Sequence, residues 1–167
     1  MKYPEKLTRV IGHVSSAGGV LSFISLLAFV ILNFVEISMR TLANRSLLIT
    51  DEFSGWLLVW MAFTGMGWTL RENGHIQIDL ITRNLSEKGK SRAQLFVCLI
   101  SLILMSFFTA FTMIFLANTY SRNLMGVSVL RFPLWLPIAG MTIGSSILTL
   151  QFLGILLRNL SVLRKPN

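Results

Sequence analysis

Four long windows without a single Asp, Glu, Lys or Arg dominate this chain of 167 residues, at positions 10–35, 53–70, 93–121 and 132–157. A helix of about 20 apolar residues crosses the roughly 30 Å hydrocarbon core of a bilayer, because each residue adds about 1.5 Å. Soluble domains rarely leave such stretches uncharged, and here 53% of the residues are hydrophobic while 13% are charged. The windows predict an all-α membrane protein with four transmembrane helices, at about residues 15–38, 52–71, 93–120 and 133–158. Since they occupy most of the chain, we expect one integral membrane domain over residues 1–167.

The basic residues lie in the connections between these windows, and they are unevenly distributed. The two chain ends and the middle connection carry eleven of them, namely Lys2, Lys6, Arg9, Arg71, Arg83, Lys88, Lys90, Arg92, Arg158, Arg164 and Lys165. The first and third connections carry four, namely Arg40, Arg45, Arg122 and Arg131. Lys and Arg accumulate in cytoplasmic connections, so we predict cytoplasmic termini. The net charge of +8 then reflects topology, and nucleic-acid binding is not expected.

The second window has polar residues at both of its ends. Thr50, Asp51 and Glu52 precede it. A hydroxyl can cap free amide groups and carboxylates suit the positive end of a helix dipole, so we expect a helix that begins at Thr50 with the Thr50 hydroxyl as its cap. Small residues such as Gly65 allow close helix approach inside the window, and Trp rings near its ends suit the membrane interfaces. Trp60, nearer the middle, is expected to pack against another helix or subunit.

Two segments outside the windows read as short amphipathic helices on the cytoplasmic surface. Residues 1–14 place apolar side chains on one face and Lys6, Arg9 and His13 on the other, which predicts an interfacial helix before the chain turns into the membrane. A second such helix is expected after Gly74, which can end the preceding helix in a left-handed turn. A cleaved signal peptide is disfavoured, because the first apolar run is too long and no small-residue cleavage site follows it.

An acid in the first window requires a separate interpretation. Acids at the bilayer centre are usually functional. Glu36, counted from about Ser16, falls instead at the outer end of the first span, and Arg40 follows it four residues later. An interfacial ion pair between the two is therefore favoured over a proton-coupling role.

The last window begins with two prolines that suit the first turn of a helix, Pro133 and Pro137, because the amides they lack would have no partner there. Gly140 and Gly144 then form a GxxxG pair, which fits packing within the chain and packing against another subunit equally well. The single cysteine, Cys98, lies inside the third window and cannot form an internal disulfide or a zinc site.

Sequence signatures of catalysis and of cofactor binding are absent. No P-loop, HExxH, CxxC pair or Ser/His/Asp arrangement occurs, so we expect neither an enzyme nor a bound cofactor or metal. The two histidines, His13 and His75, lie outside the expected spans, so bis-histidine haem ligation in the bilayer has no candidates. The sequence has no charge at the middle of a span and no internal repeat. A transporter that works alone would be expected to show one of these features.

Several residues recur in an order that points to one family. An Arg ends the first span, an acid opens the second, an aromatic and a glycine lie within it, the run G-H-I-x-I-D follows, and a Pro-Trp-Pro run with a later glycine opens the fourth. These residues are Arg40, Glu52, Trp60, Gly65, Gly74, His75, Ile76, Ile78, Asp79, Pro133, Trp135, Pro137 and Gly140. Over nearly the whole chain they resemble the small membrane subunit of tripartite ATP-independent periplasmic (TRAP) transporters, the DctQ type. One departure is Gly55, where relatives often have a larger or polar residue.

The resemblance implies a chain of the bacterial inner membrane that works with two partners. These are a large many-span membrane subunit, which holds the substrate and sodium sites, and a periplasmic binding protein that captures an organic acid. This chain would anchor the static part of the transporter among membrane lipids and help to dock the binding protein. The matched residues, together with Trp56, would then serve structure or subunit contacts. Which acid is carried cannot be read here, because the selecting residues would lie in the partners.

Two other classes of four-helix membrane protein remain as alternatives. A small multidrug exporter coupled to protons also has an acid in its first span, but that acid should lie deep in the membrane, unlike Glu36. A membrane anchor subunit of a respiratory enzyme would need haem or quinone ligands, which the sequence does not offer.

Overall fold

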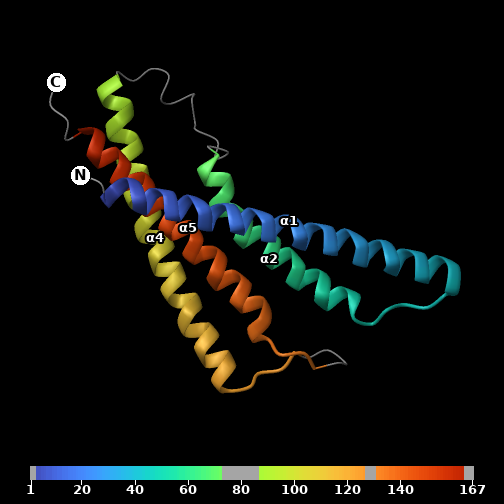
Figure 1. Cartoon of the computed structure of the whole chain (residues 1–167). Coiled ribbons are helices and arrows are strands. Elements are labelled where there is room, and N and C mark those ends of the chain that lie inside the picture. The colour runs from blue at the N-terminus through green and yellow to red at the C-terminus, as the bar shows by residue number, and fades with distance from the viewer. Residues whose placement is uncertain (1–2, 73–86, 127–130, 164–167) are drawn as a thin grey trace.

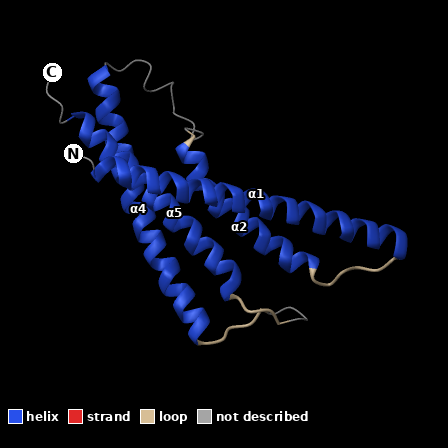
Figure 2. Cartoon of the chain, viewed as in Figure 1, coloured by secondary structure: helices blue, strands red, loops and turns tan. Residues whose placement is uncertain are grey.

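The computed structural model describes residues 3–72, 87–126 and 131–163 (Figure 1). Four helices make up these parts of the chain: α1 (Tyr3–Ala43), α2 (Thr50–Arg71), α4 (Glu87–Ser121) and α5 (Trp135–Leu163). Within the described ranges there is no strand, and only an isolated bridge pairs Met125 with Pro133 (Figure 2). The predicted all-α fold class is therefore confirmed.

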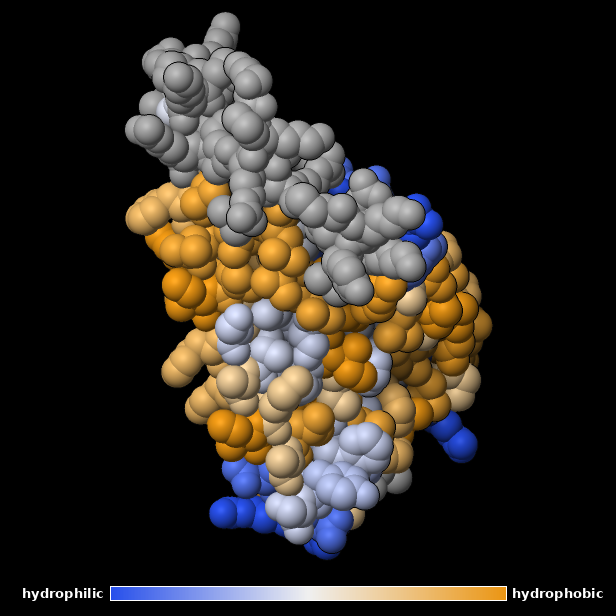
Figure 3. Space-filling model, turned by 60° about the vertical axis from the view of Figure 1, so that its left-hand side comes forward, coloured by the Kyte–Doolittle hydropathy of each residue, from blue (hydrophilic) through white to orange (hydrophobic). Residues whose placement is uncertain are grey.

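Three of the helices contain segments long and apolar enough to cross a bilayer. These segments are Arg9–Ala43, Leu95–Ser121 and Trp135–Leu157. α2 has 22 residues and would reach about 33 Å, which is also long enough to cross a bilayer. It contains several Gly, Thr and Trp residues in place of aliphatic ones. On the face shown in Figure 3, hydrophobic residues cover most of the middle of the surface, and strongly hydrophilic residues lie at its lower end and, beside the grey residues, at its upper right.

The first helix corrects one expectation from the sequence. α1 runs without a break over 41 residues, so the separate interfacial helix predicted at residues 1–14 is wrong. No proline follows Pro4 in α1, and Gly18 and Gly19 are helical because α2 packs directly on them. At 1.5 Å per residue α1 reaches about 61 Å, so it must tilt in the bilayer or extend beyond it. The second predicted interfacial helix, with His75 and Asp79, lies outside the described residues.

The helices form two antiparallel hairpins, α1 with α2 and α4 with α5 (Figure 1). α2 packs along both α1 and α5, α5 packs along α4, and α1 also reaches α5. We call the end with the connection 44–49 and the described residues 122–126 and 131–134 the loop end, and the opposite end, where α1 begins and α5 stops, the terminal end. α2 and α5 thus lie in the middle of the molecule, and α1 and α4 on its outside.

The outer helices expose much of their apolar surface. Phe34 of α1 is 71% exposed and Phe107 of α4 is 75% exposed. Among the described residues, the largest fully buried side chains are instead small and polar, namely Thr64, Thr119, Ser15 and Ser145. Small and hydroxyl side chains at helix contacts with large apolar ones outside are typical of membrane helix packing.

Candidate functional site

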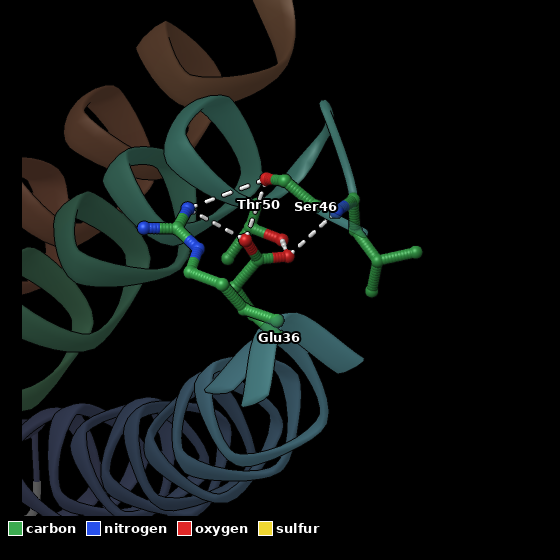
Figure 4. Close-up of polar contacts among 5 residues, drawn as sticks. Glu36, Ser46 and Thr50 are labelled. Atoms are coloured by element: carbon green, nitrogen blue, oxygen red, sulfur yellow. Dashed lines mark hydrogen bonds and ion pairs between the residues drawn. The ribbon is translucent and has the colours of Figure 1, made fainter. Parts of the chain in front are cut away.

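The carboxylate of Glu36 holds the loop end of the first hairpin together (Figure 4). Glu36 Oε1 accepts hydrogen bonds from Arg40 Nη2 at 2.8 Å and from Ser46 Oγ at 2.7 Å. Glu36 Oε2 accepts from the backbone N–H of Leu47 at 2.8 Å and from Thr50 Oγ1 at 3.0 Å. We call these five residues the Glu36 clamp. It ties the last turns of α1 to the connection and to the first residue of α2.

The clamp confirms the predicted ion pair between Glu36 and Arg40 and adds to it. The Arg40 side chain is 66% exposed, and an exposed ion pair contributes little to stability by itself. The other three donors come from the connection and from α2, and hydrogen bonds to a charged acceptor are stronger than neutral ones. Sequence reasoning missed Ser46 and Leu47. The signal that could have found them is an acid near the end of one helix, followed by a short connection rich in hydroxyls.

The start of α2 is where the sequence placed it, but its capping differs from the expectation. The helix begins at Thr50 after Ile49, and no side chain caps it. The hydroxyl of Thr50 donates to the Glu36 carboxylate instead, so the predicted capping role is wrong. Ile49, the residue before the helix, has no side-chain acceptor for the free amides, and the Thr50 hydroxyl serves as a donor to the charged carboxylate of the neighbouring helix.

A cluster of aromatic rings joins α2 to the third connection, which leads from α4 to α5. The ring of Phe132 packs edge-on against Phe53 and Trp56, with centroid distances of 4.9 Å and 5.7 Å. Glu52 lies beside this cluster, where a Cβ atom on Gly126 would come within 2.5 Å of Glu52 Oε1. A glycine at position 126 therefore leaves room for the Glu52 side chain.

Backbone hydrogen bonds pair the two described parts of the third connection, residues 122–126 and 131–134. The N–H of Gly126 donates to Phe132 O at 2.7 Å, and the N–H of Leu134 donates to Leu124 O at 3.1 Å. Pro133 takes part in the bridge with Met125, and α5 begins two residues later, at Trp135. Pro137 therefore lies in the first turn of α5 as predicted, whereas Pro133 precedes the helix. The Trp135 ring packs edge-on against Tyr120 at the end of α4, 5.9 Å between centroids.

The GxxxG pair of α5 packs inside the chain, against α2. A Cβ atom on Gly140 would lie 2.7 Å from the Trp60 ring, and one on Gly144 would overlap the carbonyl group of Phe63. Trp60 Nε1–H also donates to Leu136 O at 3.2 Å. The open question of the sequence is thus answered: these glycines serve contact between α2 and α5, and Trp60 packs on another helix of the same chain.

Polar contacts along the α1–α2 hairpin complete the framework. Ser22 Oγ donates to Met61 O at 2.7 Å, beside the close approach of Gly65 to Ser22. At the terminal end, Arg71 Nη1 donates to Gly12 O at 2.9 Å and to Ser16 Oγ. The predicted residues within the described ranges, Arg40, Glu52, Trp56, Trp60, Gly65, Pro133, Trp135, Pro137 and Gly140, are therefore spread along this framework. They do not converge on one pocket.

The described residues contain no cluster of side chains suited to bind a metal ion. Across residues 3–72, 87–126 and 131–163, no group of three or more His, Cys, Asp or Glu could hold a metal ion. Cys98 is buried, and its Sγ donates to Phe152 O at 3.5 Å in the contact between α4 and α5. The described part of the molecule is a packed framework with a preorganised loop end.

We predict that Glu36→Ala destabilises the protein more than Arg40→Ala does. The first change leaves the Leu47 N–H and the Thr50 hydroxyl without their buried acceptor, whereas the second removes only an exposed partner. The apparent Tm of the purified chain in mild detergent should fall by several degrees in Glu36→Ala and change little in Arg40→Ala. Equal losses in the two variants would contradict the clamp.

We predict that Gly144→Ala loosens the contact between α2 and α5, while Gly55→Ala is tolerated. A methyl group at position 144 meets the Phe63 backbone, which cannot move aside, and overpacking of this kind costs about 1–3 kcal/mol. At Gly55 nothing lies within 4 Å of an added Cβ, and alanine is the better helix former. Thermal denaturation of the two variants in the same detergent checks this, and a loss of stability in Gly55→Ala alone would contradict it.

Comparison with known proteins shows similarity to one transporter family. Residues 29–162 match the family described as tripartite ATP-independent periplasmic transporters, DctQ component. A protein of Haemophilus influenzae, named provisionally as a TRAP transporter small permease protein, is 29% identical over 86 residues. That match covers 51% of this chain and 53% of the relative, so it spans about half of each.

Proposed function

Because this chain belongs to the DctQ family, the small membrane component of TRAP transporters, we propose that it is the scaffold on which a larger transport subunit is assembled. In this proposal the larger subunit carries the substrate and sodium sites, and a periplasmic binding protein delivers an organic acid to it. The small chain anchors the complex in the bacterial inner membrane and presents its loop end to the binding protein. It binds neither the acid nor sodium itself.

One observation carries this proposal: the polar side chains of the described helices form their hydrogen bonds within their own helix or with a neighbouring helix or connection of the same chain. Glu36, the acid that a proton-coupled exporter would need, is fully engaged by four donors at the loop end. Large apolar side chains cover the outer faces of α1 and α4, which suits contact with lipid and with another membrane protein. A framework of this kind supports a transporter and does not by itself provide a path across the membrane.

A preorganised loop end supports the docking part of the proposal. The Glu36 clamp holds the first connection, backbone hydrogen bonds pair the described parts of the third connection, and the Phe132 ring joins the third connection to α2. Among the described non-glycine residues, three adopt left-handed backbone conformations, Asn44, Asn123 and Arg131, and all three lie in these connections. A surface that is ordered in advance loses less conformational freedom when a partner binds.

We predict that the loop end faces the periplasm and the chain termini face the cytoplasm, from the uneven distribution of Lys and Arg. Single cysteines at Asn44, Asn123 and Ser86, introduced into a Cys98→Ser background, should be tested with an impermeant thiol reagent in intact spheroplasts. We expect labelling at positions 44 and 123, both of which are exposed, and none at 86. The reverse pattern would overturn the orientation and with it the docking role.

We predict that the chain transports nothing alone. In proteoliposomes it should show no sodium-driven uptake of any carboxylate. Addition of the large membrane subunit and the binding protein should give uptake, and omission of this chain from the three should abolish or strongly reduce it. Robust uptake by the small chain alone, or full activity of the other two without it, would contradict the scaffold function.

A further inference from the structure

Two buried polar atoms in the contact between α1 and α5 have no hydrogen-bond partner. They are Ser15 Oγ and Gln151 Oε1, and no other buried side-chain nitrogen or oxygen of the described residues lacks one. Ser15 is 0% exposed and Gln151 is 8% exposed. A hydroxyl or an amide oxygen in apolar surroundings is costly when it is unpaired, so these two atoms require a partner.

The packing of α1 on α5 places the two residues opposite each other. On one side of them, a Cβ atom on Gly18 would lie 3.2 Å from Ile147 Cδ1. On the other side, a Cβ atom on Gly154 would lie 3.4 Å from Ile11 Cδ1. Ser15 stands three residues before Gly18, and Gln151 stands four residues after Ile147 on a helix that runs the opposite way. At 1.5 Å per residue the two positions therefore differ by only about 1.5 Å in height.

α2, the third helix that packs here, makes no hydrogen bond to Ser15 Oγ or to Gln151 Oε1. Gly67, which is buried against Ile147, has no side chain, and the next buried residue of α2 in this direction is Leu70. The nearby guanidinium of Arg71 donates to Gly12 O and to Ser16 Oγ instead. Ser15 and Gln151 thus lie where α1, α2 and α5 pack together, and neither Ser15 Oγ nor Gln151 Oε1 has a hydrogen-bond partner there.

We propose that one water molecule bridges Ser15 and Gln151. The Ser15 hydroxyl donates its proton to the water oxygen, and the water donates one of its protons to Gln151 Oε1. A buried water is stable when two to four polar partners hold it, and this site supplies a donor on α1 and an acceptor on α5. The site would join α1 to α5 in the half of the molecule nearest the terminal end, where these helices meet through glycine and isoleucine. It does not depend on the transport function.

Solid-state NMR of the full chain in lipid bilayers tests for the water directly. The chain has three glutamines, Gln77, Gln94 and Gln151, so ¹⁵N-glutamine labelling gives few side-chain amide signals, which a Gln151→Leu variant assigns. Magnetisation transfer from water should reach the buried Gln151 amide, and Ser15→Ala should remove most of that transfer. Ser25→Ala is the matched control, because the buried Ser25 hydroxyl donates to Leu21 O of its own helix. No transfer in the parent chain, or transfer unchanged by Ser15→Ala, would overturn the bridge.

Thermal stability provides a second, independent measurement. Ser15→Ala and Gln151→Leu should each lower the apparent Tm by roughly 2–4 °C, because each leaves part of the bridge unpaired. The double variant should lose less than the sum of the two, because it removes both polar groups together. Additive losses would show that the two residues are independent and would contradict the proposal. Strong coupling without water transfer would show a direct hydrogen bond in place of the bridge.

Discussion

The helices of this protein lie in a solvent as apolar as their own side chains, so packing against one another brings no hydrophobic free energy. Their association has to come from close contact between backbones and from hydrogen bonds. The glycines of α5 meet Trp60 and Phe63 of α2, and Gly18 of α1 meets the Thr64 carbonyl of α2. α2 therefore makes close contacts with both α1 and α5 and joins the first hairpin to the second.

Hydrogen bonds then set the register of each helix pair. Glu36 with Thr50 at one end and Arg71 with Gly12 at the other hold α1 along α2 over nearly the full length of α2. In the second hairpin, the hydroxyls of Thr109 and Thr149 lie 3.0 Å apart and Thr142 donates to Thr112 O at 3.3 Å. Such pairs are individually modest in a membrane, but they select one alignment among many similar apolar ones.

The same framework explains what a small transport component contributes. In the proposed function, the exposed apolar faces of α1 and α4 are the surfaces for lipid and for a larger membrane partner. The Phe132 ring of the third connection packs on Phe53 and Trp56 near the start of α2 and so ties this connection to the first hairpin. In the proposed function, this chain adds rigid membrane area and a fixed surface to the assembly.

The sequence by itself determined the helical class, the approximate helix positions and the pairing of Glu36 with Arg40. Charge-free length and the i to i+4 spacing are local properties, and physical chemistry acts on them without reference to the rest of the chain. The family could also be recognised, because the order of residues from Arg40 to Gly140 is a property of the chain alone.

Only the tertiary structure decided which partners these residues take. The Thr50 hydroxyl donates to the carboxylate of Glu36, fourteen residues earlier in the chain. Gly140 of the GxxxG pair packs against Trp60, which lies eighty residues earlier. The continuity of α1 was likewise not apparent, because an amphipathic start is compatible both with a helix at the interface and with an extension of the span. Side chains that face each other across helices are chosen by register and close approach, which are properties of pairs of helices that no single stretch of sequence contains.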